Sequence, residues 1–274
     1  MDADKEMGLF WRWEYTCAMF LCSLNDRNPR VVALQILLNR FKPQGIELGV
    51  DGSYGPKTQG AVKAFHAEVL RTSATGATAG IVVWERMVRE HGLQVVESVD
   101  VTDPEVAELV LPSFPTAIEI GAMSNGVTQV VNDIISRAKG QRNLLAIRFH
   151  GHGAPGLAAI SAGKRSLIPG INPIAQLTVL TPEVVRILRP ILEKLGPLLI
   201  DFGFVEFHAC RVAQGPQGAR LMRDLVDIWQ APITAGTTSQ QAGGNSNFSL
   251  TGTVVSVFPG GVNLKAWAKS RKEA

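Results

Sequence analysis

Cysteine is scarce in this sequence, and long uninterrupted apolar runs are absent. The 274 residues include 3 cysteines, Cys17, Cys22 and Cys210, and an odd number cannot form a complete disulfide framework. A small extracellular domain held together by disulfides is therefore excluded. No stretch has the apolar continuity of a membrane-spanning helix, so we expect no transmembrane segment.

Charge of either sign is also limited. The net charge is only +3, and residues 269–272 form the one short basic cluster. We expect no nucleic-acid partner, because such binding needs a concentrated basic surface. The acidic opening of the chain, followed by Arg12 and Glu14, does not match a secretory signal. We therefore expect synthesis in the cytosol without a signal peptide, and we expect no cofactor.

Residues 28–92 have the pattern of a small helical domain, preceded by an N-terminal extension at residues 1–27. Asparagine followed by proline at residues 28–29 is a typical helix start. An Asp51-Gly52 turn supplies positive φ, and Gly55-Pro56 predicts the start of a second helix. A third helix is expected from about residue 81 to residue 90. Such a domain is near the lower size limit for independent folding.

The turn and the helix after it carry a recognisable motif. Its residues are Asp51, Gly52, Tyr54, Gly55 and Thr58. With this motif, residues 28–92 resemble the peptidoglycan-binding domain found beside many cell-wall hydrolases, and the resemblance implies peptidoglycan as a partner. The same residues also turn the chain and fill a core, so a purely structural three-helix module remains the alternative.

Strand and helix alternate from residue 116 onward. We expect strands at 116–123, 143–150, 204–209 and 232–237, and helices at 125–139, after residue 181 and at 218–229, with an antiparallel strand near 248–258. This alternation predicts a mostly parallel sheet flanked by helices. The α/β domain is expected at 116–262, after a linker at 93–115 that contains a short helix. A basic C-terminal tail is expected at 263–274.

Two of the predicted strands end in alternating polar residues. In chain order the two triplets are Arg148, His150 and His152, and Glu206, His208 and Cys210. Side chains two residues apart on a strand share a face, and the separation between the triplets is the same at each position. If the strands are level parallel neighbours, the triplets pair as a salt bridge, a histidine pair and a cysteine-histidine dyad.

A dyad of Cys210 and His152 would be a nucleophile with its proton acceptor, because only the thiolate attacks. The N–H groups of Gly153 and Cys210 could form an oxyanion hole. The alternative interpretation is structural: the polar residues at the strand ends are buried and satisfy one another.

The motif at residues 152–153 and the motif at 208–211 together resemble the caspase-like fold of cysteine peptidases, over roughly residues 116–261. The resemblance implies Cys210 as nucleophile, His152 as the histidine that assists departure of the leaving group, and Gly153 as an oxyanion donor. His150 competes with His152 for that role, because it too precedes a glycine. Val212 stands where the caspase signature ends in glycine, so specificity for aspartate is not implied.

The sequence thus predicts a cell-wall-targeted cysteine hydrolase that cleaves an amide bond in peptidoglycan stem peptides or in a wall-associated protein. An exported antibacterial effector would fit both the wall-binding module and the hydrolase domain. Delivery machinery other than the Sec route would bring it to the periplasm or wall. One alternative is a non-catalytic peptidoglycan-binding or assembly protein with a scaffold domain. Another is a tetrahedral zinc site, with the ligands His150, His152, His208 and Cys210.

Overall fold

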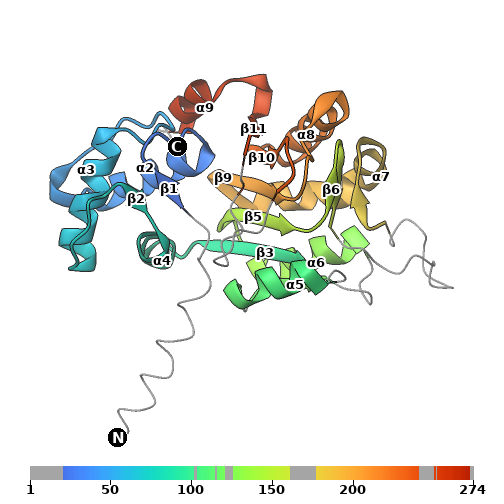
Figure 1. The fold of residues 1–274 in the computed structure, drawn as a ribbon, viewed down its shortest axis with the longest axis horizontal. Helices are drawn as coiled ribbons and strands as arrows, with labels where there is room; N and C mark the ends of the chain where they lie inside the picture. Colours follow the sequence, from blue (N-terminus) through green and yellow to red (C-terminus); the bar gives the residue numbers. More distant parts are fainter. Residues whose placement is uncertain are drawn as a thin grey trace, which may run out of the picture.

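The computed structural model describes residues 21–101, 104–114, 116–120, 126–160, 177–240, 250 and 252–271. A helical module lies beside a mixed α/β domain, and the last helix, at the carboxyl end, lies against the module (Figure 1). Of the expected extension 1–27, residues 1–20 and therefore Cys17 lie outside the described residues. Among the described residues, no helix is long and apolar enough to cross a membrane.

The module is built from short helices and one small antiparallel sheet of two strands. Its elements are β1 (Cys22–Ser23), α2 (Pro29–Phe41), α3 (Pro56–Phe65), the π-helix His66–Leu70, β2 (Thr78–Ala79) and α4 (Ile81–Glu90). The expected helix start is confirmed, since the Asn28 side chain accepts a hydrogen bond from the Val31 N–H at 3.1 Å. Helix α3 likewise begins directly after Gly55.

Six strands form the central sheet, in the order β11-β10-β9-β5-β3-β4. Their bounds are β3 (Gln94–Asp100), β4 (Ile118–Ile120), β5 (Leu144–His150), β9 (Leu199–His208), β10 (Ile233–Gly236) and β11 (Val254–Val257). All neighbours are parallel except β11, which runs antiparallel to β10. The mostly parallel sheet with one antiparallel addition is therefore confirmed.

The expectation of a linker at residues 93–115 is wrong. Strand β3 lies inside the sheet, between β5 and β4, and helix α5 (Pro104–Val110) packs on Val99 through Val106 and Val110. The sequence of β3 mixes three valines with four polar residues and has no strict alternation, so it carries no clear strand signal. Its polar residues Glu97 and Asp100 are in fact buried, and Glu97 meets Arg148 and His150 of the neighbouring strand rather than water.

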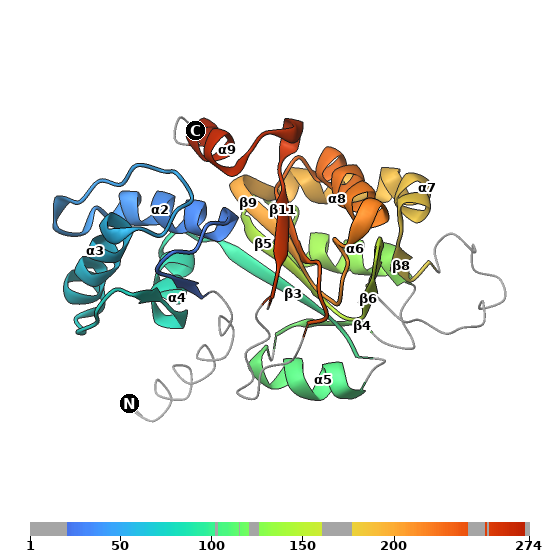
Figure 2. The same ribbon diagram turned by 45° about the horizontal axis from the view of Figure 1, so that its top comes forward.

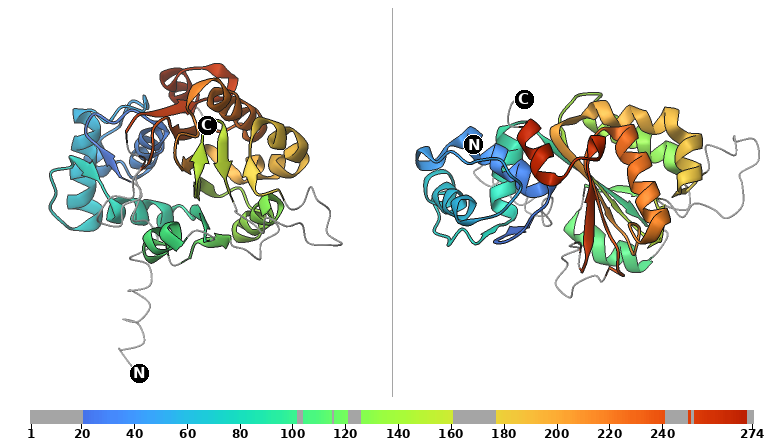
Figure 3. Two further views of the ribbon diagram at one scale, coloured as in Figure 1. Left: turned by 45° about the vertical axis from the view of Figure 1, so that its right-hand side comes forward. Right: turned by 90° about the horizontal axis from the view of Figure 1, so that it is seen from above.

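Helices cover both faces of the sheet. Helices α6 (Gly126–Ala138), α7 (Pro182–Leu192) and α8 (Gly215–Trp229) share one hydrophobic core with one face. The module covers part of the other face, and the two layers are seen on either side of the sheet in Figure 3. The N-cap expected at Thr181 is confirmed, since its hydroxyl accepts from Val184 N–H. A second, small antiparallel sheet follows β5: β6 (Gly153–Ala154), β7 (Leu157–Ala159) and β8 (Val179–Leu180).

The module is not separated from the sheet by a gap. Its core side chains, such as Leu34 and Trp84, form one continuous cluster with Ala146 of β5 and Phe204 of β9. Cys22 is buried in this cluster. The two units are therefore joined by a shared apolar core, which is how a module this small buries enough surface to be stable.

The expected basic tail at 263–274 is also corrected, as far as the structure describes it. Residues Leu264–Arg271 form helix α9, which contacts α2 (Figure 2). Trp267 is 3% exposed and packs with Val32, Val50 and Phe258. Lys265 and Lys269 are exposed on this helix, so the sequence resembled a basic tail, although its apolar residues dock it on the module.

Replacing Trp267 with alanine should lower the free energy of unfolding by about 3–5 kcal/mol, the usual cost of truncating a buried Trp. Equilibrium unfolding in urea measures this loss. Lys269→Ala, on the exposed side of the same helix, is the matched control and should change stability by less than about 0.5 kcal/mol. Equal midpoints for the two variants would show that α9 is not part of the folded core.

Candidate functional site

The motif turn of the module is organised by the side chain of Gln35. Its amide nitrogen donates to Asp51 Oδ1 at 2.9 Å and to the Ser53 carbonyl at 3.1 Å, and it lies 3.2 Å from Thr58 Oγ1. Its amide oxygen accepts from the N–H groups of Asp51 and Gly52 at 3.0 and 2.9 Å. The turn is therefore rigid, and the buried Thr58 serves this network.

The remaining motif residues also have structural roles. Tyr54 is buried, and its hydroxyl donates to the Gly76 carbonyl at 2.7 Å. Gly52 has φ of +73°, and a Cβ there would lie 2.8 Å from Leu264 Cδ1, so only glycine fits. Gly55 precedes Pro56 at the start of α3. Asp51 remains exposed and is the motif residue most open to a ligand.

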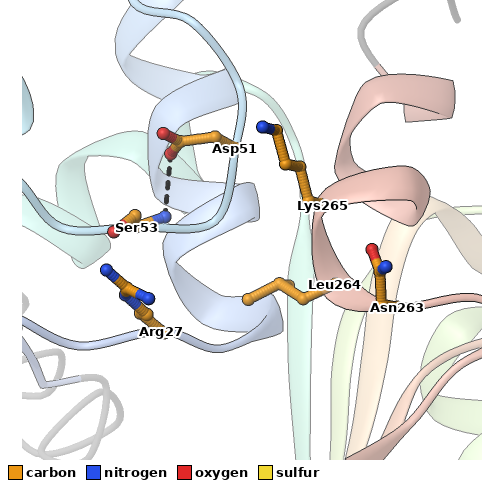
Figure 4. A pocket seen from close by; sticks show the side chains of 6 residues that line it. All are labelled: Arg27, Asp51, Ser53, Asn263, Leu264 and Lys265. Atoms are coloured by element: carbon orange, nitrogen blue, oxygen red, sulfur yellow. Dashed lines mark hydrogen bonds between the residues drawn. The ribbon is translucent and has the colours of Figure 1, made fainter.

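A pocket lies between this turn and the first residues of α9 (Figure 4). Its volume is about 470 Å³. The residues that line it are Arg27, Asp51, Ser53, Asn263, Leu264 and Lys265. Asp51 and Ser53 belong to the motif turn, whereas the sequence did not indicate Asn263, Leu264 and Lys265, because the packing of α9 brings them to this turn.

At the other candidate site, the expected strand register is confirmed. Strands β5 and β9 are parallel neighbours, and Arg148 lies opposite Glu206 as His150 lies opposite His208. The rings of His150 and His208 have centroids 4.7 Å apart. Both strands then end, so His152 and Cys210 lie in the turns just beyond them.

The ion pairs of these strands involve partners that the sequence did not indicate. Glu206 pairs with Arg30 of α2, whose Nη2 lies 3.0 Å from Glu206 Oε2. Arg148 pairs with Glu97 of β3 at 2.5 Å. The expected salt bridge between Arg148 and Glu206 is thus replaced by a wider network that extends into the module and into β3. All four side chains are buried.

Each histidine also contacts one of these carboxylates. His150 Nε2 lies 2.7 Å from Glu97 Oε2, and His208 Nε2 lies 3.0 Å from Glu206 Oε2. The Phe114 ring stacks on His150 with centroids 5.5 Å apart. Both histidines are 1% exposed, so neither is placed to meet a substrate. The structural interpretation therefore holds for the first two positions of each triplet, which we call the inner rows: Arg148 and Glu206, and His150 and His208.

Burial and charge shift the pKa values of this network in opposite directions. Burial alone would raise the pKa of Glu206, but the Arg30 guanidinium and the hydrogen bond with His208 outweigh it and hold the pKa well below the ordinary value. Arg148 and His150 likewise lower the pKa of Glu97 against the effect of its burial. Burial lowers the pKa of His208 to about 4, despite the nearby Glu206. The network therefore holds ionised carboxylates and a neutral His208.

Cys210 and His152 are more accessible than the buried histidines two residues before them on each strand. The Cys210 side chain is half-buried, and its Sγ accepts a hydrogen bond from Gln240 N–H at 3.3 Å. His152 is exposed. Gly153 lies against the Cys210 backbone, since a Cβ on this glycine would lie 2.5 Å from the Cys210 carbonyl oxygen. The turns that bear the two proposed catalytic residues are therefore in contact, and they are accessible where the inner rows are not.

The zinc alternative required His150, His152, His208 and Cys210 to converge. The rings of His150 and His208 instead turn toward Glu97 and Glu206. Within the described ranges, no group of three or more His, Cys, Asp or Glu side chains is arranged to hold a metal ion. The residues at this site therefore do not present the ligand geometry of a zinc ion.

Comparison with known proteins concerns the helical module. Residues 27–75 match the family described as "Putative peptidoglycan binding domain". Neither the curated proteins nor the solved structures gave a match to this chain. The match supports a peptidoglycan-binding module at residues 27–75 and hence association with the cell wall, and it includes the Gln35-centred turn described above.

Sequence reasoning missed Arg30, Glu97 and Gln240. Arg30 follows Pro29 in the first turn of α2, where a charged residue is ordinarily exposed. Glu97 lies in the segment that was expected to be a linker. Gln240 contacts Cys210 through its backbone, which no side-chain pattern can reveal. The signal that the sequence offered for the segment around Glu97 was its three valines, at positions 95, 96 and 99.

Replacing Arg30 with methionine should reduce the free energy of unfolding by about 3–5 kcal/mol, because Glu206 would remain buried without its partner. Urea unfolding of the single variant and of Arg30→Met with Glu206→Leu measures the effect. The double variant should recover much of the loss. Arg142→Met is the control at an exposed ion pair, that with Asp201, and should cost less than about 1 kcal/mol. An Arg30→Met cost as small as that of Arg142→Met would contradict the burial of the pair.

Stability should fall as the pH drops from about 6.5 to about 4. Unfolded His208 binds a proton below its ordinary pKa of 6.5, whereas folded His208 stays neutral down to a pKa of about 4. Between these pH values the unfolded state binds one more proton than the folded state. The free energy of unfolding therefore falls by up to about 1.4 kcal/mol for each pH unit of acidification. Urea unfolding at pH steps of 0.5 should show a shallower slope for His208→Gln. Parallel slopes for the two proteins would rule out this assignment.

Proposed function

We propose that this chain is a cell-wall-targeted cysteine hydrolase that cleaves an amide bond in peptidoglycan stem peptides or in a wall-associated protein. The family match at residues 27–75 supports its wall association. One observation carries the catalytic part: the pairing of β5 with β9, which puts the turns of His152 and Cys210 side by side at one edge of the sheet. Ligand sites of parallel sheets lie at this carboxyl edge. The caspase-like resemblance belongs to the same proposal.

The proposed chemistry is acyl transfer through a thioester. The Cys210 thiolate attacks the amide carbonyl, a C–S bond forms, and His152 gives a proton to the departing amine as the C–N bond breaks. Water then attacks the thioester, which releases the carboxylic acid and returns the thiol. The N–H groups of Gly153 and Cys210 would hold the oxyanion of each tetrahedral intermediate.

The accessibility of the histidines favours His152 over His150 in this scheme. His150 is buried and occupied by Glu97, whereas His152 is exposed in the turn that contacts Cys210. The backbone of Gln240 positions the Cys210 sulfur, which accepts from the Gln240 N–H at 3.3 Å and lies 3.7 Å from the Gln240 carbonyl oxygen.

The second candidate is a non-catalytic wall-binding or assembly protein in which the α/β domain is a scaffold. The buried network favours it, because the polar residues of both strands satisfy one another without any substrate. For either candidate we propose action in the periplasm or at the wall, reached by a route other than Sec, as for an antibacterial effector. Cell fractionation followed by immunodetection would locate the protein.

Incubation with purified sacculi tests both halves of the proposal in one experiment. The wild type should sediment with the sacculi and release new amine groups, whereas Cys210→Ala should sediment equally and release amines at least about a thousandfold more slowly. Iodoacetamide should label Cys210 much faster than Cys22, which is buried and whose pKa is raised by that burial.

His152→Ala should lose amine release because the departing amine would have no proton donor, whereas the matched control His91→Ala, distant from the strand ends, should retain activity. Sedimentation without amine release, together with equally slow labelling of Cys210 and Cys22, would favour the scaffold. Failure of the wild type to sediment would exclude wall attachment.

A further inference from the structure

The pocket between the motif turn and α9 is lined partly by residues inside the family match and partly by residues outside it. Arg27, Asp51 and Ser53 lie within residues 27–75, whereas Asn263, Leu264 and Lys265 lie far beyond them. Half of the lining therefore lies outside the residues that match the family. The module without α9 would present an open surface here rather than a pocket.

Helix α9 is held firmly in this place. Trp267 and Ala268 are buried against α2 and its surroundings. Gly52 leaves the space that Leu264 occupies, since any Cβ there would overlap with this leucine. The wall of the pocket that carries Lys265 is thus fixed relative to the wall that carries Asp51.

Two cations face this pocket from different walls (Figure 4). In the part of the chain that the structure describes, neither the Arg27 guanidinium nor the Lys265 ammonium has a carboxylate within ion-pair distance. The Asp51 carboxylate lies across from Lys265, and the hydrogen bonds from Gln35 and Ser53 both end on its Oδ1. The pocket therefore offers positive charge to an anionic group of a ligand and a carboxylate oxygen to a cationic group.

We propose that this pocket is a subsite for a peptidoglycan stem peptide, with Arg27 and Lys265 on a free carboxylate and Asp51 Oδ2 on a free amine. The proposal rests on the wall attachment proposed above and names the part of the wall that is recognised. Stem peptides carry both groups, whereas the glycan is largely neutral and a wall phosphate polymer would be repelled by Asp51. A volume of about 470 Å³ is within the usual range for small-ligand sites, and Leu264 supplies an apolar contact for the peptide's side chains.

The test measures binding of a soluble disaccharide-tetrapeptide containing diaminopimelate to the full chain by isothermal titration calorimetry. All proteins carry Cys210→Ala, so that the ligand is not consumed. Arg27→Gln and Lys265→Gln should each weaken binding about tenfold, because each removes one charge-assisted hydrogen bond. Lys269→Gln, on the same helix but outside the pocket, should bind as the parent does. The disaccharide without peptide should not bind.

Equal affinity of the parent, Arg27→Gln and Lys265→Gln would overturn the subsite, and so would equal binding of the peptide-free disaccharide. Lys265-dependent binding of poly(glycerol phosphate) in place of the muropeptide would overturn the choice of ligand. Sedimentation with sacculi separates the two levels: if the parent sediments and the pocket variants sediment equally well, only the subsite fails. If the parent does not sediment, the proposed wall attachment fails as well. Thermal melts followed by circular dichroism verify that each variant is folded.

Discussion

The buried ion pair between Arg30 and Glu206 is the contact on which the arrangement of this molecule depends. It joins α2 of the module to β9 of the sheet, and two nitrogens of the guanidinium meet the two carboxylate oxygens. Burying two charges costs nearly as much as their attraction returns, so the pair contributes less to net stability than its geometry suggests. A two-point contact of this kind does fix orientation. The apolar core around Phe204 and Ala146 supplies the stability, and the ion pair determines how the module is seated.

The same pair is one end of a buried network that runs toward the proposed catalytic edge. Glu206 contacts His208, whose ring lies beside that of His150, and His150 contacts Glu97 of the next strand but one from β9. The strand ends cannot slide past each other without separating these partners. Cys210 and His152 are each two residues beyond a histidine of this network. Residues that would never touch a substrate therefore hold the turns that carry the proposed chemistry.

The sequence was informative wherever a local pattern has one physical meaning. The equal spacing of the two polar triplets correctly predicted which residues of β5 and β9 are paired, because parallel strands keep a fixed register. The helix starts at Asn28 and Thr181 follow from capping chemistry. Strand β3 was not predictable, because Glu97 is indistinguishable from a solvated residue until Arg148 and His150 are placed beside it. Helix α9 was hidden for the same reason, since Lys265 and Lys269 face outward and its apolar residues are buried only once α2 is placed beside them.

The two proposed sites lie toward opposite ends of the sheet, and this separates their roles. Helix α9 follows β11, which runs antiparallel to β10, and Arg271 at its end donates to the carbonyl of Asp201 near the start of β9. Cys210 follows the other end of β9. At about 3.3 Å per residue, the nine steps from Asp201 to Cys210 span at most roughly 30 Å, and the register shift before Phe204 shortens this distance. Because the pocket lies on the module side of α9 and Cys210 lies beyond the carboxyl end of β9, we expect a stem peptide held in the pocket to differ from the one that Cys210 would attack. The pocket would act as a tether, and a target bond would have to lie on another stem or on a protein attached to the same wall.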